Sequence, residues 1–499
     1  MLTKVYRKDS PYGAKIFLLY LHPMSRKGKL DIVLKDVLIE DIAAEGKSIA
    51  HARLEGDDPE SPGRVLFVEF AVPGDIVDVR LTRKKSSFLE GKIIRINKPS
   101  PQRQDPFCSH FGTCGGCKWQ SLPYDIQLRA KQRQVYDQLT RIGHLKLPEF
   151  QPIIGSEKTV LYRNKLEFSA SSKRWLLPGE DPELCSGPGL GFHVGKFFDK
   201  VLDIDHCYLQ PEPSNAIRLA VKEYLIRNGL SFYNIRENNG LFRNMFVRTT
   251  DDGQVMVIMC FGSDSPAIHP LLGHLRDTFP EITSLYYVIN TKGNDSISDQ
   301  DCILFSGEPA IYEKMENLRF RIGPKSFYQT NTGQALQLYR KAREFAGLDG
   351  SQIVYDLYTG TGTIAQFVSA GARKVIGIEY VPEAIEDART NAAANGISNC
   401  EFFAGDMKDI LTDSFISEHG RPDVMIVDPP RAGMHPDVVQ TILRAAPKRI
   451  VYVSCNPASQ ARDIALMSGK YTVTAVQPVD MFPHTMHVEN ICKLDYNAD

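Results

Sequence analysis

Short apolar runs rich in β-branched residues follow one another along the first hundred residues of the chain, and turn signals separate them. The runs are Ile32–Leu34, Ser48–Ala50, Val65–Val68, Ile76–Val79 and Lys92–Ile96. Pro73-Gly74 marks a tight turn between the third and fourth runs. This pattern predicts several short strands over residues 31–98, arranged as a small N-terminal β-barrel.

The hydrophobic period then changes. From Tyr124 to Leu145 apolar positions recur at helical spacing, which predicts a helix over about residues 122–148 that packs on a later domain. The predicted apolar face consists of Leu128, Val135, Tyr136, Leu139 and Ile142. The rest of residues 99–320 holds many short β-type runs and predicts an α+β central domain. Examples are Lys165–Phe168, Met245–Arg248 and Val255–Ile258.

Strands and helices alternate regularly over residues 321–499, which is typical of a Rossmann-like α/β domain with a doubly wound parallel sheet. At the other end, the apolar run Ile16–Leu21 is far too short to span a bilayer. No small-residue cleavage motif follows it, so a signal peptide is not favoured. We expect residues 1–30 to form a poorly ordered extension and the protein to be a cytoplasmic monomer that contacts no membrane.

Composition narrows the choice of partners. Hydrophobic residues make up 42% and charged residues 24% of the 499 residues, which is ordinary for a globular chain of about three domains. The formal net charge of −1 provides no global attraction for nucleic acid, so such binding needs a local patch. From Arg80 to Arg103 there are eight Lys or Arg and a single acid, Glu90. This stripe suits phosphate contacts, and it suits a solvated charged hairpin equally well.

Three strand ends in the last domain carry polar residues that suit a nucleoside cofactor. The strand Val354–Leu357 runs into the glycine loop Tyr358–Gly362. A second strand ends in Glu379, placed for ribose hydroxyls, and a third leads to Asp406, placed for an adenine amino group. The loop differs from the Gly-x-Gly-x-x-Gly pattern of dinucleotide-binding sites. These acids and glycines look like an S-adenosylmethionine site in a seven-stranded methyltransferase fold.

A candidate nucleophile lies at the same predicted edge. Cys455 follows the buried strand Val451–Ser454 and precedes a proline, and Asp428 ends another strand. A cysteine near the amino end of a helix is expected to have a lowered pKa, which would make it reactive. Further along, Glu489 is a candidate general base, with His484 and His487 as competing bases or as structural residues.

Ten cysteines in the chain are too few for a disulfide scaffold. Cys108, Cys114 and Cys117 have the spacing C-x5-C-x2-C, which suits thiolate coordination of a metal. Spacing alone fits zinc and an iron–sulfur cluster equally well. Cys207 is the preferred fourth ligand by its context, and Cys185 is the alternative.

Five motifs together resemble the RNA 5-methyluridine (uracil-C5) methyltransferase family. They are Phe327-Tyr328-Gln329-Thr330-Asn331, Asp356-Leu357-Tyr358, Asp428-Pro429-Pro430-Arg431-Ala432-Gly433, Ser454-Cys455-Asn456-Pro457 and Phe482-Pro483-His484-Thr485. The resemblance covers nearly everything after residue 31. It is strongest to the ribosomal RNA members that carry a TRAM barrel and an iron–sulfur cluster. Transfer-RNA members usually lack both, so the resemblance implies 23S rRNA as the substrate.

The resemblance also implies a role for each matching residue. Cys455 matches the nucleophile that adds to C6 of uracil, and Glu489 matches the base that removes the C5 proton. Phe327 matches an aromatic residue near the target base, and Thr363 stands where relatives often have asparagine at the cofactor. The other positions that match S-adenosylmethionine contacts are Gln329, Tyr358, Glu379, Asp406 and Asp428. The implied [4Fe–4S] ligands, with a structural role preferred to a redox one, are Cys108, Cys114, Cys117 and Cys207.

Other functions compete with this one. The chain could methylate tRNA, or it could be a catalytically silent RNA-binding ribosome assembly factor, although intact Cys455 and Glu489 argue against the latter. Cytosine-5 methyltransferases generally place their cysteine beside the proline of the fourth-strand motif. Here that motif, Asp428–Gly433, contains no cysteine.

Overall fold

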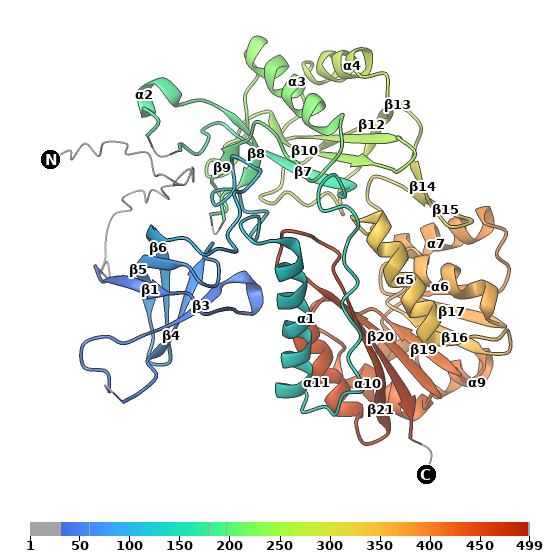
Figure 1. Cartoon of the computed structure of the whole chain (residues 1–499). Helices are drawn as coiled ribbons and strands as arrows, with labels where there is room; N and C mark the ends of the chain where they lie inside the picture. The colour runs from blue at the N-terminus through green and yellow to red at the C-terminus, as the bar shows by residue number, and fades with distance from the viewer. Residues whose placement is uncertain (1–30, 59, 178, 196, 498–499) are drawn as a thin grey trace. The chain divides into compact units, whose positions relative to one another are not determined.

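The structure, a computed structural model, describes residues 31–497 apart from positions 59, 178 and 196 (Figure 1). The extension expected over residues 1–30 lies outside the described residues. The chain divides into two compact units. The first contains the N-terminal sheet and residues 118–123, and the second contains residues 108–117 and nearly everything from Tyr124 onward.

The N-terminal unit is built on a six-stranded sheet in the order β1-β5-β6-β4-β3-β2. Its strands are β1 (Val33–Leu38), β2 (Asp41–Ile42), β3 (Ser48–Ala52), β4 (Arg64–Glu69), β5 (Ile76–Lys84) and β6 (Phe88–Lys98), and the short 3-10 turn η1 (Ala44–Gly46) precedes β3. Alternate apolar side chains from these strands fill one core, which includes Leu66, Val68, Val77 and Leu89. The predicted all-β N-terminal domain is therefore confirmed.

The basic stripe follows the β5–β6 hairpin, and most of it is exposed. Arg83, Lys84, Lys92 and Arg95 all lie on the surface of these two strands. Arg103 differs, because its guanidinium lies 2.6 Å from the fully buried carboxylate of Asp75. It also donates to a backbone carbonyl at 2.9 Å. Arg103 therefore stabilises the end of the domain and does not belong to the exposed stripe.

The central part of the second unit is a seven-stranded sheet in the order β13-β12-β11-β10-β7-β8-β9. Its strands are β7 (Lys165–Ser171), β8 (Gly189–His193), β9 (Val201–Asp203), β10 (Phe242–Thr249), β11 (Val255–Phe261), β12 (Ile282–Ile289) and β13 (Ile303–Gly307). Its helices are α2 (Pro182–Cys185), α3 (Ser214–Arg227) and α4 (Ile268–Thr278). The hairpin of β14 (Ile311–Met315) and β15 (Leu318–Ile322) follows.

The C-terminal part is a second seven-stranded sheet in the order β18-β17-β16-β19-β20-β22-β21. Its strands are β16 (Ile353–Leu357), β17 (Lys374–Glu379), β18 (Cys400–Ala404), β19 (Val424–Val427), β20 (Arg449–Ser454), β21 (Tyr471–Val479) and β22 (Glu489–Tyr496). Helices α5 (Thr332–Ala346), α6 (Thr363–Val368), α7 (Pro382–Ala394), α8 (Met407–Ile410), α9 (Asp413–His419), α10 (Pro436–Ala445) and α11 (Pro457–Met467) connect them, with the 3-10 turn η2 (Ser369–Gly371) after α6. Five parallel strands are followed by β22, which runs antiparallel to both β20 and β21.

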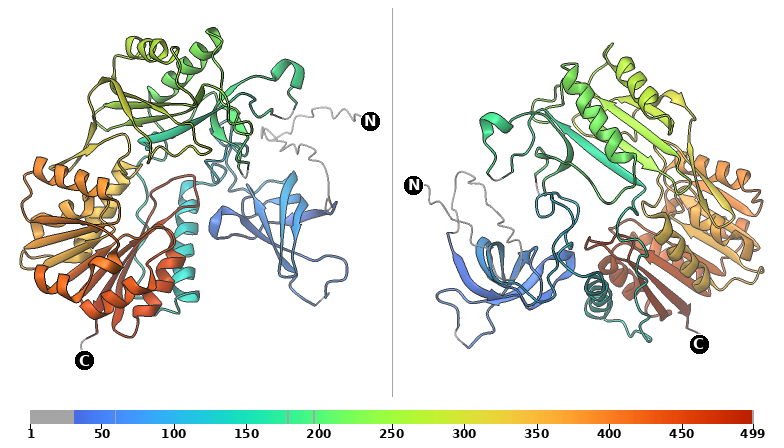
Figure 2. Two further views of the ribbon diagram at one scale, coloured as in Figure 1. Left: turned by 180° about the vertical axis from the view of Figure 1, so that it is seen from behind. Right: turned by 45° about the horizontal axis from the view of Figure 1, so that its top comes forward.

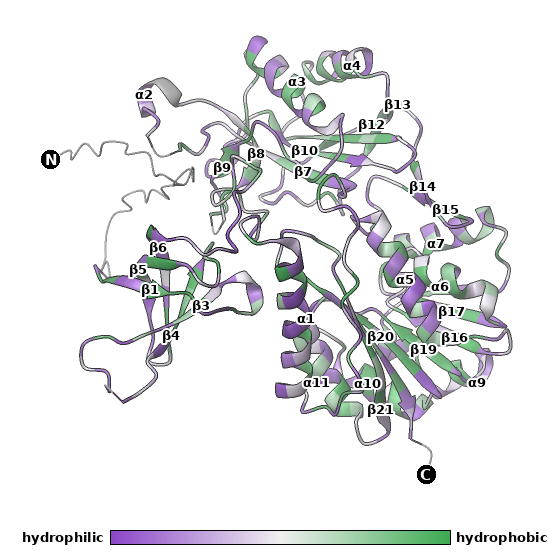
Figure 3. Cartoon of the chain, in the orientation of Figure 1, coloured by the Kyte–Doolittle hydropathy of each residue, from purple (hydrophilic) through white to green (hydrophobic). Residues whose placement is uncertain are grey.

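Burial of both faces explains why these strands read as continuous apolar runs (Figure 3). One core cluster joins one face of the C-terminal sheet to Phe246 and Met256 of the central sheet. A second cluster covers the opposite face with α10 and α11, and Figure 2 shows helices on both sides of the sheet. The predicted methyltransferase-type α/β architecture with an α+β central domain is confirmed.

Helix α1 (Tyr124–Arg141) packs against α11 and β21 of the C-terminal sheet (Figure 1). Its buried face was predicted only in part. Val135 and Leu139 are fully buried, whereas Tyr136 and Ile142 are 48% and 49% exposed. Polar side chains, Gln127 and Lys131, take the remaining buried positions, because they bind a loop described below. Among the helices of the described residues, none is long and apolar enough to cross a membrane.

Candidate functional site

The glycine loop after β16 is fixed by hydrogen bonds to the end of β17. The amide of Gly360 donates to one carboxylate oxygen of Glu379 at 3.1 Å, and the amide of Val381 donates to the other at 3.0 Å. Gly362 has a φ of 74°. A Cβ there would lie 2.9 Å from both Ala388 and the Phe402 ring, so this turn requires glycine. The loop and Glu379 therefore form one rigid edge.

Two buried carboxyl groups extend this edge onto the neighbouring strands. Asp356 in β16 is 1% exposed and accepts from the Thr359 hydroxyl at 2.5 Å. Burial, and then the Glu379 charge, raise the pKa of Asp356 to about 7. Burial and the Asp356 charge raise the pKa of Asp428, just after β19, to about 7. These acids suit a cationic ligand.

The remaining predicted cofactor residues lie along the same edge. Tyr358 has a φ of 64°, and burial, followed by nearby charges that include Asp406 and Glu379, raises its pKa to about 12. Asp406 caps α8 by accepting from an amide at 3.2 Å. The Thr363 hydroxyl lies 3.3 Å from that of Thr361. A ligand with ribose hydroxyls, an amino group and a positive charge fits this set of acceptors, as S-adenosylmethionine does.

The candidate nucleophile and base come from adjacent strands. Cys455 directly follows β20, and Asn456 caps α11 by accepting from the Ala458 amide at 3.2 Å. Ser454 pairs with Asn490 in the register of β20 and β22. Glu489, the first residue of β22, therefore comes beside Cys455 although 33 residues separate the two in the sequence.

The expected lowering of the Cys455 pKa is wrong. Burial, and then the charges of Glu489 and Asp428, raise the pKa of Cys455 to about 11. Arg431 opposes this rise through its charge and a hydrogen bond to the thiol. Burial and Asp428 likewise raise the pKa of Glu489 well above its usual value. The helix amino end is outweighed because the thiol is buried and because two carboxyl groups face the sulfur.

Buried polar groups on α1 hold the loop that leads into Glu489. Lys131 and Asp480 are both fully buried and form an ion pair at 2.5 Å. Lys131 also donates to the carbonyl of Phe482 at 3.0 Å. The Gln127 side chain accepts from the His484 amide at 2.9 Å and lies 3.2 Å from the His484 ring.

The two histidines of this loop are neutral at physiological pH. Burial and the Lys131 charge lower the pKa of His484 to about 4. Burial and the Arg431 charge lower the pKa of His487 to about 4. His484, with its Gln127 contacts and a φ of 65°, has a structural role. His487 Nδ1 lies 3.3 Å from the Arg431 guanidinium, so this pair belongs to the site.

Phe327 lies on the loop between β15 and α5 and is 69% exposed. The loop is fixed from the central domain, because Arg248 donates to the Ser326 carbonyl at 2.7 Å. Asn164 also donates to the Gln329 carbonyl at 2.9 Å. An exposed aromatic ring on a fixed loop suits a stacking contact with a base.

The four thiols assigned to a cluster come from two segments that pack together. His110 accepts a hydrogen bond from the Asp205 amide at 2.9 Å, and Cys114 forms a β-bridge with Val194. Burial, and then the charge of Cys108, raise the pKa of Cys207. The charges of Cys117 and Cys207 both reach Tyr162. The two cysteine-bearing segments therefore lie next to each other.

The structure does not display a finished metal site. No group of three or more His, Cys, Asp or Glu side chains within the described part of the chain is arranged to hold a metal ion. Cys185 ends α2, and its side chain lies outside the described residues.

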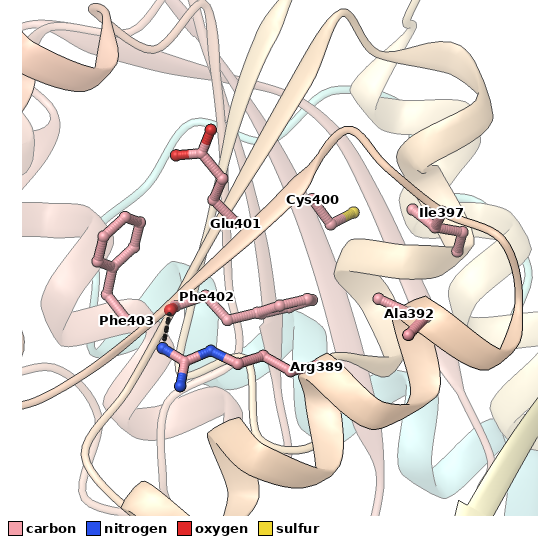
Figure 4. A pocket seen from close by; sticks show the side chains of 8 residues that line it. Arg389, Ala392, Ile397, Cys400, Glu401, Phe402 and Phe403 are labelled. Carbon is pink, nitrogen blue, oxygen red and sulfur yellow. Dashed lines mark hydrogen bonds between the residues drawn. The ribbon is translucent and has the colours of Figure 1, made fainter.

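A recess on the outer edge of the C-terminal sheet is separate from this site (Figure 4). It is lined by residues of α7 and β18, including Arg389, Cys400 and Phe402, and Arg389 donates to the Phe402 carbonyl at 2.7 Å. None of the predicted cofactor or catalytic residues lines it.

Three residues of the site were missed in the sequence. Tyr339 on α5 is 5% exposed, hydrogen-bonds Gln329 and lies within reach of the Asp428 and Glu489 charges. Its helical spacing indicates only a core residue. Lys131 and Arg431 were missed because their roles depend on long-range contacts. Arg431 is part of the motif Asp428–Gly433, which follows one strand, and Cys455 follows another strand of the same sheet. Their shared sheet edge was the signal that could have placed Arg431 near the cysteine.

The glycine loop, the acids at three strand ends and the sheet order define the class of the protein as an S-adenosylmethionine-dependent methyltransferase. Comparisons with known proteins identify the family. A tRNA (uracil-5-)-methyltransferase domain matches residues 307–495, and a TRAM domain matches residues 34–94.

Relatives of similar length support this match. An RNA methyltransferase of Porphyromonas gingivalis is 56% identical over 92% of this chain and its own full length. One of Chlorobaculum tepidum is 38% identical over 86% of this chain and 90% of its own. The tRNA (uracil-54, C5)-methyltransferase of Pyrococcus abyssi, solved with S-adenosyl-L-homocysteine, is 28% identical, with a TM-score of 0.70 over 92% of this chain and 100% of that one. The chain belongs to the RNA uracil-5-methyltransferase family, which confirms the resemblance.

Proposed function

We propose that this enzyme methylates C5 of a specific uridine in RNA, with 23S rRNA as the substrate. The observation that carries the proposal is the convergence of Cys455, Glu489 and Asp428 at the strand ends that also hold the glycine loop. Uracil-C5 methylation requires a thiol nucleophile, a carboxyl group that can act as a base, and a binding site for the methyl donor next to both.

The chemistry follows from the electronic structure of uracil, whose C5 is a poor nucleophile. Addition of the Cys455 thiolate at C6 produces an enolate with an electron-rich C5. S-adenosylmethionine, when bound, supplies an electrophilic methyl group to that carbon. Glu489 then removes the C5 proton, and elimination of the thiolate restores the ring.

Protonation must change before each step. With its pKa raised to about 11, the Cys455 thiol keeps its proton at pH 7, and the raised pKa of the buried Glu489 favours its protonated form. The thiol must lose its proton before it adds, and Glu489 must be ionised before it acts as a base. Because the site is buried, the uridine must leave its stack to reach it. Phe327 is proposed to contact the flipped base or its neighbour.

The RNA class is the finer part of the proposal. The cysteine set and the TRAM domain favour ribosomal RNA through the family members that share them. The Pyrococcus abyssi tRNA enzyme favours the second candidate, tRNA. The alignment with that tRNA enzyme covers 92% of this chain, which is too much to leave out the N-terminal sheet. The N-terminal sheet alone therefore does not distinguish an rRNA methyltransferase from a tRNA methyltransferase.

We further propose a [4Fe–4S] cluster bound by Cys108, Cys114, Cys117 and Cys207. The contacts between the two segments and the charge coupling of Cys108 with Cys207 support it. Protein purified without oxygen should contain iron and sulfide with visible cluster absorption, and Cys207→Ser should lose both. A colourless, iron-free native protein that methylates RNA at full rate would exclude the cluster. A thiolate cluster also agrees with a cytoplasmic location, where thiols stay reduced.

The test of the function is methyl transfer from labelled S-adenosylmethionine to unmodified ribosomal RNA and tRNA, followed by nucleoside analysis. We expect label in 5-methyluridine from 23S rRNA. If label appears only in tRNA, the proposed reaction is correct and the substrate is tRNA instead of 23S rRNA. No label in either RNA, from protein that binds the cofactor, would instead support an RNA-binding assembly factor.

A further inference from the structure

The backbone of Arg431 is fixed beside the segment that carries the candidate nucleophile. It follows Pro429-Pro430, whose rings restrict the approach of the chain after β19. Its carbonyl accepts from the Asn456 side chain at 2.9 Å and from the Ser459 hydroxyl at 3.1 Å. The residue after the nucleophile and the first turn of α11 therefore fix Arg431 relative to Cys455.

The guanidinium of Arg431 is fixed on its other side by a neutral histidine. Its Nη2 lies 3.3 Å from His487 Nδ1. Since the pKa of His487 is lowered to about 4, its ring is neutral at pH 7, and because the arginine can only donate, Nδ1 accepts while Nε2 carries the ring proton. The planar guanidinium has further N–H groups for the Cys455 thiol.

The surroundings of the sulfur act on its ionisation in opposite directions. Burial, Glu489 from β22 and Asp428 from the end of β19 all disfavour a thiolate, whereas the Arg431 cation favours it. Arg431 also favours the charged form of Glu489. One cation thus acts on both groups that must ionise.

We propose that Arg431 is the catalytic residue that stabilises the Cys455 thiolate, through a direct hydrogen bond oriented by His487 and Asn456. The proton of the thiol leaves to solvent, and the guanidinium remains charged throughout. The inference rests on the proposed function for its purpose, but the ionisation itself requires neither RNA nor cofactor.

The test is therefore the rate of Cys455 alkylation by iodoacetamide as a function of pH, read by peptide mass spectrometry on the full-length protein. The thiolate displaces iodide, so the rate follows the thiolate fraction. Arg431→Gln should slow alkylation at pH 8 by about tenfold or more, one pKa unit or more. Arg431→Lys should lie between, because it keeps the charge and loses the planar fork.

Two controls sharpen the result. Arg129→Gln removes an exposed cation of α1 that pairs with its helix neighbour Asp125, and it should leave the alkylation profile unchanged. His487→Gln should shift the profile less than Arg431→Gln, because the charge remains. A profile for Arg431→Gln that coincides with the native one overturns the proposal, whatever happens to turnover. If the native protein fails to methylate any RNA while Arg431→Gln still shifts the profile, only the proposed reaction fails.

Discussion

The Lys131–Asp480 ion pair leads to a quantitative prediction. Both side chains are fully buried, and Lys131 makes two charge-assisted hydrogen bonds, to Asp480 at 2.5 Å and to the Phe482 carbonyl at 3.0 Å. Lys131→Met removes both and leaves the Asp480 carboxylate buried without its cation. Hydrogen bonds to charged groups contribute about 1.5–3 kcal/mol each, and breaking a buried pair costs about 3–5 kcal/mol. We expect the variant to lose about 3–5 kcal/mol of unfolding free energy.

Urea unfolding is a suitable assay, because the two tryptophans of the chain lie in different units. Trp119 lies in the N-terminal unit, and Trp175 lies in the unit that contains α1. Loss of stability should appear in the transition reported by Trp175. Methyl transfer should also fall, because the loop that Lys131 binds leads directly into Glu489.

A double variant tests the pairing itself. Lys131→Met with Asp480→Asn should cost at least about 1 kcal/mol less than the sum of the single changes, because the buried charge is gone. Arg129→Met, which removes an exposed ion pair on the same helix, should cost less than about 0.5 kcal/mol. A loss below about 1 kcal/mol for Lys131→Met would show that the pair contributes little and that the reasoning is wrong.

Three further predictions concern the site. Cys455→Ala should abolish methyl transfer, and Glu489→Gln should accumulate a covalent RNA–protein adduct visible by denaturing gel; normal release of product by Glu489→Gln would contradict its assignment as the base. Gly362→Ala should weaken S-adenosylmethionine binding and lower the unfolding free energy more than Gly360→Ala does, both measured by calorimetry. A Cβ at Gly362 meets Ala388 and Phe402 at 2.9 Å, whereas one at Gly360 meets nothing within 4 Å. Equal effects of the two substitutions would mean that only the positive φ matters. The pKa of Asp428 is raised to about 7, so its ionisation as pH rises from 6 to 8 should tighten binding of the cationic cofactor. The stability that its raised pKa provides is complete below the ordinary value of 3.8 and is lost as pH rises from there through about 7. Asp428→Asn should flatten the pH dependence of cofactor affinity, and an unchanged slope would refute this.

The strands were predictable because their signals are local. Val424–Val427 is an apolar run followed by Asp428-Pro429, and Val451–Val453 is one followed by Ser454-Cys455. The structure has a strand at each run. The acids at strand ends were found because parallel strands share one carboxyl edge. This rule brought Glu379, Asp406 and Asp428 to one edge without any structure.

Charge balance could not be predicted in this way. The helix amino end beside Cys455 suggested a lowered pKa, but Glu489 and Asp428, which oppose it, become neighbours only in the folded sheet. On α1, period alone placed Tyr136 on the buried face, whereas the structure buries Lys131 there. A lysine is buried only when it has a partner, and this partner is 349 residues away in the sequence.

The antiparallel strand β22 has a consequence for the order in which the enzyme becomes active during synthesis. Cys455 emerges from the ribosome before Glu489, and Glu489 reaches its place only when β22 inserts between β20 and β21. A slip of one residue in that insertion would turn Glu489 to the opposite face of the sheet. A partly synthesised chain therefore has the thiol but no base beside it. The enzyme becomes active in one late step, the insertion of β22. Activity then indicates that the sheet has formed in the correct register.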